Sequence, residues 1–255
     1  MIHIPTAPLA HTVFDLAAWG SSLALGVLLY RWRLRDDVTR LATRTDGGYF
    51  VALALGAIPG AWLAGSLNTL RSPGGALSHS VVGALVGAIV GVEIYKRLRG
   101  IKGSTGGPFV GSFTLGVVIG RLGCFFTGLP DQTYGTPTAL PWAVDLGDGI
   151  GRHPVQLYES AAMALFLLAY LAGLAVRAPW AMRRGFYAMC LAYAVQRFAW
   201  EFLKPYPRLI GPLNLFHILC LGLAAYGLTL FLSDRAREHA EGRALSVPGP
   251  DHQPV

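Results

Sequence analysis

Residues 76–95 read ALSHSVVGALVGAIVGVEIY, and this stretch decides the class of fold. Its central part, Val81–Val92, contains no charged side chain. A helix needs roughly 20 mostly apolar residues to cross a bilayer. Gly83, Gly87 and Gly91 stand four residues apart, the spacing at which small residues let two helices approach closely in lipid. The stretch therefore predicts a transmembrane helix that packs tightly against another helix.

The composition of the whole chain extends this prediction to a membrane protein. The chain has 255 residues, of which 53% are hydrophobic and only 14% are charged, and its mean hydropathy is +0.46. A soluble domain carries about 25% charged residues. So few charges cannot cover a surface in water, and lipid is the alternative solvent. We expect no cleavable signal peptide, because residues 1–11 lack a basic region and the first apolar run is long.

Seven segments are long and apolar enough to span a membrane, which predicts an all-α bundle of about seven transmembrane helices. The expected spans are Val13–Tyr30, Tyr49–Leu67, Ala76–Tyr95, Phe109–Leu129, Val155–Val176, Gly185–Leu203 and Leu209–Leu232. Residues 1–232 would form one transmembrane domain with residues 130–152 as a polar insertion. Residues 233–255 lack periodicity and are expected to be a disordered tail. Further glycine pairs in the second and fourth spans predict a compact core around the second, third and fourth helices.

The basic residues fall mostly on one side of the expected bundle. That side holds Arg31, Arg33, Arg35, Arg40, Arg44, Lys96, Arg97, Arg99, Lys102, Arg177, Arg183, Arg184, Arg235, Arg237 and Arg243. The connections on the other side hold Arg71, Arg152, Lys204 and Arg208. By the positive-inside rule, the N-terminus and the insertion lie outside and the C-terminus is cytoplasmic. The net charge of +7 then reflects topology and anionic lipid headgroups rather than a nucleic-acid partner.

Ionisable residues inside the spans carry the functional prediction, because a charge near the bilayer centre costs at least about 2.5–3.5 kcal/mol. Arg121 lies roughly 12 Å below the outer end of its span, at about 1.5 Å per residue. Arg197 and Glu201 are one helical turn apart, with Tyr193 one turn earlier. The alternative for Arg121 is a structural arginine bound to backbone carbonyls. The alternative for Arg197 and Glu201 is a plain ion pair. His79 stands near the outer end of another span, where a lone histidine is more often structural.

A row of polar side chains opens the fifth span, more than helix capping requires: Arg152, His153, Gln156, Tyr158 and Glu159. Two arginines that face one cavity suit a phosphate, because their donors match its oxygens in a fork. A phosphate at this depth and attached to acyl chains is a phospholipid headgroup.

Lys204 is expected to be an interfacial anchor and Glu93 a surface ion-pair partner. Asp15, Asn68, Asn214 and His217 receive no role. The cysteines have no C-x-x-C spacing, which predicts neither a disulfide framework nor a metal site.

These residues resemble the phosphatidylglycerol–prolipoprotein diacylglyceryl transferase family of bacterial inner membranes, with the motifs in the same order over residues 74–201. Residues 120–125, GRLGCF, are similar to the family's G-R-x-G-N-F, and residues 152–159, RHPVQLYE, nearly match R-H-P-x-Q-L-Y-E. The other matching positions are Gly135, Pro141-Trp142-Ala143, Tyr193, Arg197-Phe198 and Glu201-Phe202. The motif over residues 152–159 is highly specific.

The resemblance implies that residues 1–232 are the catalytic domain of a multi-pass protein of the bacterial cytoplasmic (inner) membrane. The implied reaction moves the diacylglyceryl group of phosphatidylglycerol to the lipobox cysteine thiol in the signal-peptide region of a preprolipoprotein, and glycerol phosphate leaves. Arg121 and Arg197 would hold the phosphate, Glu201 would orient Arg197, and His79 would be the base for the thiol. The implied substrate pocket also contains Cys124, Arg152, His153, Gln156, Tyr158, Glu159 and Tyr193. No metal or organic cofactor is expected.

The chain departs from the family pattern at several positions. Cys124 and Thr127 stand where the family has asparagines, Leu129 where it has a glutamate, and His79-Ser80-Val81 where it has H-G-G. These changes alter hydrogen bonding around the headgroup or the acceptor. The alternatives are a paralogue with another acceptor, a lipid-binding protein without catalysis, and an anion transporter. A transporter is disfavoured because the inner halves of the spans are nearly free of charge.

Overall fold

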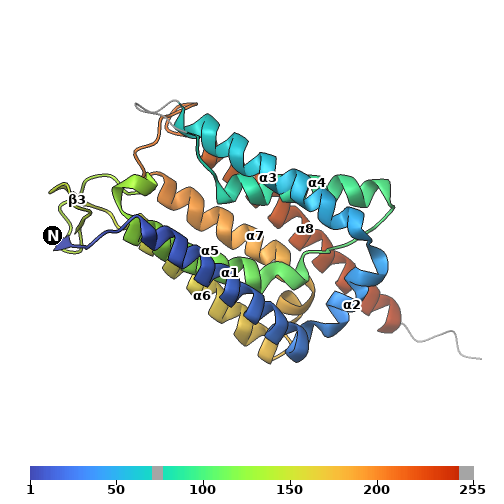
Figure 1. The fold of residues 1–255 in the computed structure, drawn as a ribbon. Helices are drawn as coiled ribbons and strands as arrows, with labels where there is room; N and C mark the ends of the chain where they lie inside the picture. Colours follow the sequence, from blue (N-terminus) through green and yellow to red (C-terminus); the bar gives the residue numbers. More distant parts are fainter. Residues whose placement is uncertain (71–76, 247–255) are drawn as a thin grey trace, which may run out of the picture.

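The structure, a computed structural model, describes residues 1–70 and 77–246, with side chains as far as Ala236. Figure 1 shows long helices packed side by side, with the N-terminus and the insertion at one end of the bundle. The α-helices are α1 (Leu9–Leu29), α2 (Arg35–Arg44), α3 (Gly47–Thr69), α4 (Val81–Leu98), α5 (Val110–Thr127), α6 (Val155–Ala175), α7 (Pro179–Glu201) and α8 (Leu215–Ser246). Shorter elements are the π-helix η1 (Tyr30–Leu34), the 3-10 helices η2 (Gly107–Phe109) and η3 (Leu129–Asp131), and the strands β1 (Ile2–His3), β2 (Val144–Asp145) and β3 (Gly151–Arg152).

The protein is a mostly helical, multi-pass membrane protein. Within the described residues, five helical segments are long and apolar enough to cross a membrane: Leu9–Arg44, Gly47–Thr69, Gly107–Thr127, Val155–Ala175 and Leu215–Ala236. Helices α4 and α7 occupy the two remaining expected spans but carry more charged residues. Helix α7 packs between α6 and α8, which cover much of its surface. Neighbouring helices thus reduce the cost of its polar side chains.

Glycines bring α3 and α4 into direct backbone contact, as the sequence predicts. A Cβ atom at Gly87 would overlap the carbonyl oxygen of Gly56, and one at Gly83 would overlap that of Gly60. The predicted extension of this core to α5 is wrong. Helix α5 packs mainly against α1 and α6, and a Cβ at Gly120 would have no neighbour within 4 Å. The reason is a cavity between α5 and the start of α4, which the spacing of glycines within one helix cannot reveal.

The insertion is held by a small sheet in the order β1-β2-β3, in which β1 pairs parallel and β3 antiparallel to β2. The Asp145 carboxylate accepts hydrogen bonds from the backbone N–H groups of residues 147–149 at 2.9–3.1 Å. These bonds and the contact with His3 hold the pKa of the Asp145 carboxyl below its usual range. Arg152 likewise donates to Asp148 and lowers the pKa of that carboxyl. The N-terminus and the insertion therefore form one ordered cap over the bundle.

Two further predictions differ from the structure in detail. Helix α8 continues to Ser246, beyond Ser233 where the disordered tail was expected to begin, because the intervening segment is rich in Ala, Arg and Glu, which favour helix. Glu93 binds the largely buried Lys96 and also accepts from the Tyr226 hydroxyl, so this pair joins α4 to α8 rather than lying on the surface. Arg71, Ala76 and residues 247–255 lie outside the described residues.

Candidate functional site

A cavity of about 680 Å³ lies between α1, α5, the segment before α4 and the ends of α7 and α8. Four of the predicted site residues line it: His79, Arg121, Cys124 and Arg197. The expectation that the two arginines share one cavity is therefore met by the geometry. Trp19, Phe113, Val117 and Phe216 add apolar walls. Such a combination of cationic and apolar lining suits an amphiphilic ligand.

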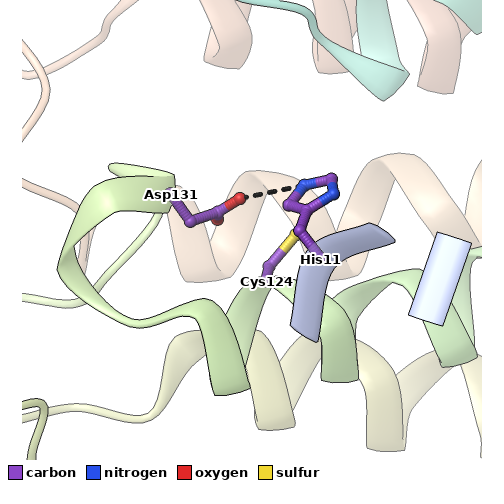
Figure 2. Close-up of side chains that lie close together, drawn as sticks. All are labelled: His11, Cys124 and Asp131. Carbon is purple, nitrogen blue, oxygen red and sulfur yellow. Dashed lines mark ion pairs between the residues drawn. The ribbon is translucent and has the colours of Figure 1, made fainter. Parts of the chain in front are cut away.

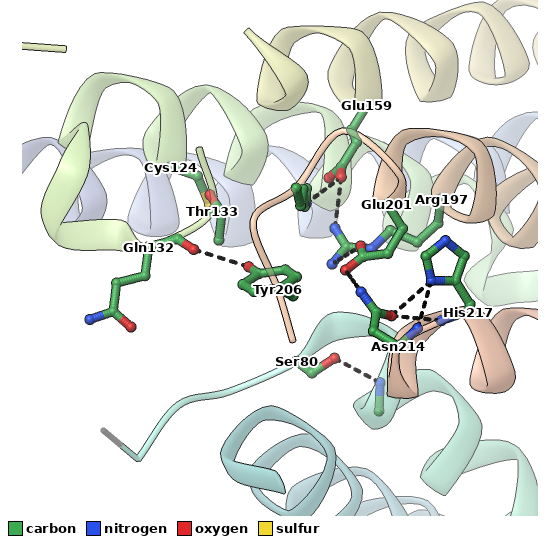
Figure 3. Close-up of polar contacts among 12 residues, drawn as sticks. Ser80, Cys124, Gln132, Thr133, Glu159, Arg197, Glu201, Tyr206, Asn214 and His217 are labelled. Atoms are coloured by element: carbon green, nitrogen blue, oxygen red, sulfur yellow. Dashed lines mark hydrogen bonds and ion pairs between the residues drawn. The ribbon is translucent and has the colours of Figure 1, made fainter. Parts of the chain in front are cut away.

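Glu159 is the centre of the charged network behind this cavity. Its side chain is 1% exposed, and its carboxylate forms ion pairs with three cationic side chains. The Arg121 Nε atom lies 2.5 Å from Oε2, while Arg197 Nη1 and Lys204 Nζ lie 2.7 and 2.6 Å from Oε1. Figure 3 shows Glu159 reaching from α6 toward Arg197 on α7. One carboxylate thus sets the positions of cations from α5, α7 and the segment after α7.

A second carboxylate orients Arg197 from its other side. Glu201 Oε2 lies 3.1 Å from Arg197 Nη2, and Glu201 Oε1 accepts a hydrogen bond from Asn214 Nδ2 at 2.9 Å. Asn214 Oδ1 in turn accepts from the backbone N–H of His217 at 3.1 Å. Figure 3 shows this chain running from α7 to the start of α8. A guanidinium whose two Nη atoms are both held by carboxylates loses little further conformational freedom when a ligand binds.

The charged network contains more positive than negative charge. Within the described part of the chain, its ion pairs join three cations, Arg121, Arg197 and Lys204, to two carboxylates, Glu159 and Glu201. All five side chains are at most 8% exposed. An uncompensated buried charge is costly unless a partner neutralises it. A singly charged anion in the adjacent cavity would balance this excess.

His79 reaches the cavity from the segment that precedes α4. Its ring lies against Trp62, with 3.8 Å between ring centroids. The next residue, Ser80, caps α4 by accepting a hydrogen bond from the Gly83 N–H at 3.2 Å. The serine after His79, where the family has glycine, therefore has a local structural use. His79 remains exposed and is free to meet a ligand in the cavity.

Other predicted pocket residues lie away from the cavity lining. Arg152 binds Asp148 in the insertion and stands over the Tyr134 ring at 5.1 Å. Tyr158 accepts a hydrogen bond from the Trp142 indole N–H at 2.7 Å, and the His153 ring lies 6.3 Å from its ring. The two remaining predicted residues, Gln156 and Tyr193, are buried behind the network and do not line the cavity.

The prediction that Lys204 is an interfacial anchor is wrong. Its side chain is fully buried and binds Glu159 at 2.6 Å, because the chain makes a tight turn directly after the end of α7. Asn214 and His217, which received no role, belong to the Glu201 network. His11 and Asp131 also line the cavity and form an ion pair with each other. The four-residue spacing of His11 and Asp15 could have indicated a contact on one face of α1, whereas no local spacing indicates the contact of His11 with Asp131.

Comparisons with known proteins support the resemblance. A family model described as prolipoprotein diacylglyceryl transferase matches residues 9–233. Three similar proteins are each named phosphatidylglycerol–prolipoprotein diacylglyceryl transferase. The protein from Methylococcus capsulatus is 34% identical over 62% of this chain and 62% of its own length. The protein from Methylocella silvestris is 32% identical over 89% and 84%, and that from Cereibacter sphaeroides 28% over 97% and 94%. The match to the first relative thus spans less than two thirds of that protein. No solved structure matches the chain significantly.

Proposed function

Because this chain belongs to the prolipoprotein diacylglyceryl transferase family, we propose that it transfers the diacylglyceryl group of phosphatidylglycerol to a preprolipoprotein. The acceptor is the thiol of the lipobox cysteine in the signal-peptide region, and glycerol phosphate leaves. The observation that carries this proposal is the pair of arginines in one cavity whose buried network has one positive charge in excess. The phosphodiester of phosphatidylglycerol supplies one negative charge at that position.

Arg121 and Arg197 bind the phosphate and stabilise the charge that develops when glycerol phosphate leaves. Two observations support this role: both arginines line the same cavity, and Glu159 pairs with both of them and holds them in position. Glu201 is the positioning residue of Arg197, at 3.1 Å. Preorganised donors stabilise a developing charge without moving during the reaction, which is why the anchoring carboxylates matter.

His79 accepts the proton of the acceptor thiol. It lines the same cavity as the arginines and is exposed, so an acceptor peptide can reach it. Glu159 belongs to the phosphate site through its arginines, while Gln156 and Tyr193 support the site from behind. Arg152, His153 and Tyr158 shape the cap formed by the insertion.

The bundle crosses the bacterial inner membrane seven times, with α4 and α7 as spans in addition to the five apolar segments. The N-terminus and the insertion lie in the periplasm and the C-terminus in the cytoplasm. The asymmetric distribution of basic residues supports this orientation. The cavity lies toward the end of the bundle where α1 begins, and in the proposed orientation it lies in the periplasmic half of the membrane.

Complementation of a bacterial strain depleted of its own diacylglyceryl transferase tests this proposal. The expected result is growth and thioether-linked lipid on a reporter prolipoprotein. The substitutions at Cys124, Thr127 and Leu129 favour a second candidate, a paralogue that uses the same donor lipid with another thiol acceptor. Failed complementation together with release of glycerol phosphate from labelled phosphatidylglycerol would select the paralogue. Failure of both assays would refute the transferase proposal.

A further inference from the structure

Three potential metal ligands meet at one wall of the cavity, and they come from three separate segments. His11 lies in the first turn of α1, Cys124 near the end of α5, and Asp131 in η3. Their ligand atoms all lie within 4.8 Å of one another, and His11 Nε2 is 3.2 Å from Asp131 Oδ1. Figure 2 shows the imidazole, the thiol and the carboxylate directed toward one another. These distances suit three side chains that bind one metal ion.

Two of these side chains are already oriented by hydrogen bonds at their far atoms. His11 Nδ1 lies 2.8 Å from the Asp15 carboxylate, which leaves Nε2 as the atom that faces the cluster. The Thr133 hydroxyl donates to Asp131 Oδ2, which leaves Oδ1 facing His11. Metal-binding histidines almost always donate their other ring N–H to a carboxylate or carbonyl, which fixes the tautomer and the ring. The cluster therefore has the outer contacts of a metal site as well as its ligands.

We propose that His11, Cys124 and Asp131 bind one Zn²⁺ ion whose fourth position opens into the cavity. One nitrogen, one sulfur and one oxygen donor form a set that zinc accepts, whereas Mg²⁺ and Ca²⁺ prefer oxygen alone. With bonds of about 2.0–2.3 Å, ligand atoms of a tetrahedral zinc site lie about 3.3–3.7 Å apart. The His11–Asp131 distance of 3.2 Å is close to this range, and the Cys124 Sγ atom, which lies within 4.8 Å of both, would move toward them when the ion binds. Three protein ligands with one open position are typical of a catalytic rather than a structural zinc.

The chemistry of the open position follows from the proposed function, on which this step rests. An acceptor thiol that bound zinc would pass its proton to His79, which lines the same cavity, and become a thiolate. The sulfur lone pair then forms the C–S bond to the glyceryl carbon, and the C–O bond breaks with its electrons on the phosphate oxygen. The Arg121 Nη1 atom lies 3.9 Å from Cys124 Sγ, so the zinc site borders the phosphate site. The thiolate and the carbon that it attacks would therefore meet between zinc and the arginines.

Metal content of the purified full chain tests the site without reference to activity. The protein in detergent is equilibrated with Zn²⁺, freed of excess metal and measured by elemental mass spectrometry. We expect about one zinc per chain, retained in Cys190→Ala and lost in Cys124→Ala and His11→Gln. Cys190 is the matched control because it is buried in α7 and does not line the cavity. Wild-type protein without bound zinc would overturn the proposal and leave His11 and Asp131 as a simple ion pair.

Cobalt provides an independent readout of the ligands. The wild-type and Cys190→Ala proteins loaded with Co²⁺ should show thiolate-to-metal charge-transfer absorption, and Cys124→Ser should lack it while remaining folded by circular dichroism. Charge transfer that persists in Cys124→Ser would place the metal elsewhere and overturn the proposal. In a transfer assay, chelation should reduce the rate at least tenfold and Zn²⁺ should restore it. Zinc binding in a protein that transfers no lipid to any thiol would support the site and refute the proposed function instead.

Discussion

Replacement of Glu159 by glutamine should be among the most destabilising single substitutions in the site. The carboxylate is 1% exposed and faces Arg121, Arg197 and Lys204 at 2.5, 2.7 and 2.6 Å. With charge centres about 4 Å apart and an effective dielectric constant of about 20, each pair attracts by about 4 kcal/mol before desolvation is subtracted. Removing one member of a buried ion pair costs about 3–5 kcal/mol net, because the remaining charge stays buried. We expect Glu159→Gln to reach that range.

The free energy of unfolding is measured by titrating the detergent-solubilised protein from a mild detergent into SDS and following helix content. The matched control is Asp37→Asn, which removes a carboxylate from the pair with the exposed Arg40 and should cost at most about 1 kcal/mol. Adding Lys204→Met to Glu159→Gln removes one of the unbalanced cations. The free energy of unfolding of the double variant should therefore be about 1 kcal/mol or more above the value expected if the two single effects simply added. A Glu159→Gln protein as stable as Asp37→Asn would refute the claim that this carboxylate holds the three cations together.

The remaining predictions concern the reaction, the helix packing and the cap. Arg121→Lys should keep the fold but lower the transfer rate from labelled phosphatidylglycerol about 100-fold or more, because lysine retains charge and loses the fork; wild-type activity would exclude a phosphate-binding role. Gly87→Val should prevent accumulation of folded protein, because its side chain would overlap the Gly56 backbone, whereas Gly20→Ala, with no neighbour within 4 Å, should give the normal amount of folded protein in the gel-filtration peak. The Asp145 carboxyl has a lowered pKa, so its stabilisation of the cap is complete above its usual pKa of about 3.9 and is lost as the pH falls through the lower folded value. The protection factors of the insertion amides, which are corrected for the intrinsic exchange rate at each pH, should therefore fall only below about pH 4 in the wild type but should already be low at pH 7 in Asp145→Asn; equal protection at pH 7 would show that the carboxylate is dispensable.

Most of the membrane helices were predictable because a span has a local signature. The expected Val155–Val176 and the observed Val155–Ala175 differ by one residue, since proline precedes the helix and apolar residues fill it. The glycine spacing of α4 likewise predicted a close helix contact, since residues four apart share one helix face. The spacing did not say which helix would be the partner or that a cavity separates α5 from the start of α4, and the prediction for α5 failed for this reason.

The cavity was predictable only in part. Motif order and the cost of charge in lipid identified Arg121 and Arg197 as residues that face a polar site. The same reasoning misassigned Lys204, because the residue lies just past the end of a helix and only the folding of the following segment buries it. It placed Glu159 in the same substrate pocket as the arginines but did not predict that Glu159 is their common ion-pair partner.

The sequence by itself determined that this chain is a helical membrane protein with arginines at lipid depth, because hydrophobic length, charge and motif spacing act within single segments. Only the tertiary structure decided which residues of different segments meet. Glu159 joins Arg121, Arg197 and Lys204, and His11 meets Cys124 and Asp131, through contacts between elements far apart in the chain. The physical reason is that helical periodicity fixes neighbours along one helix, whereas distances across the bundle depend on how side chains pack between helices.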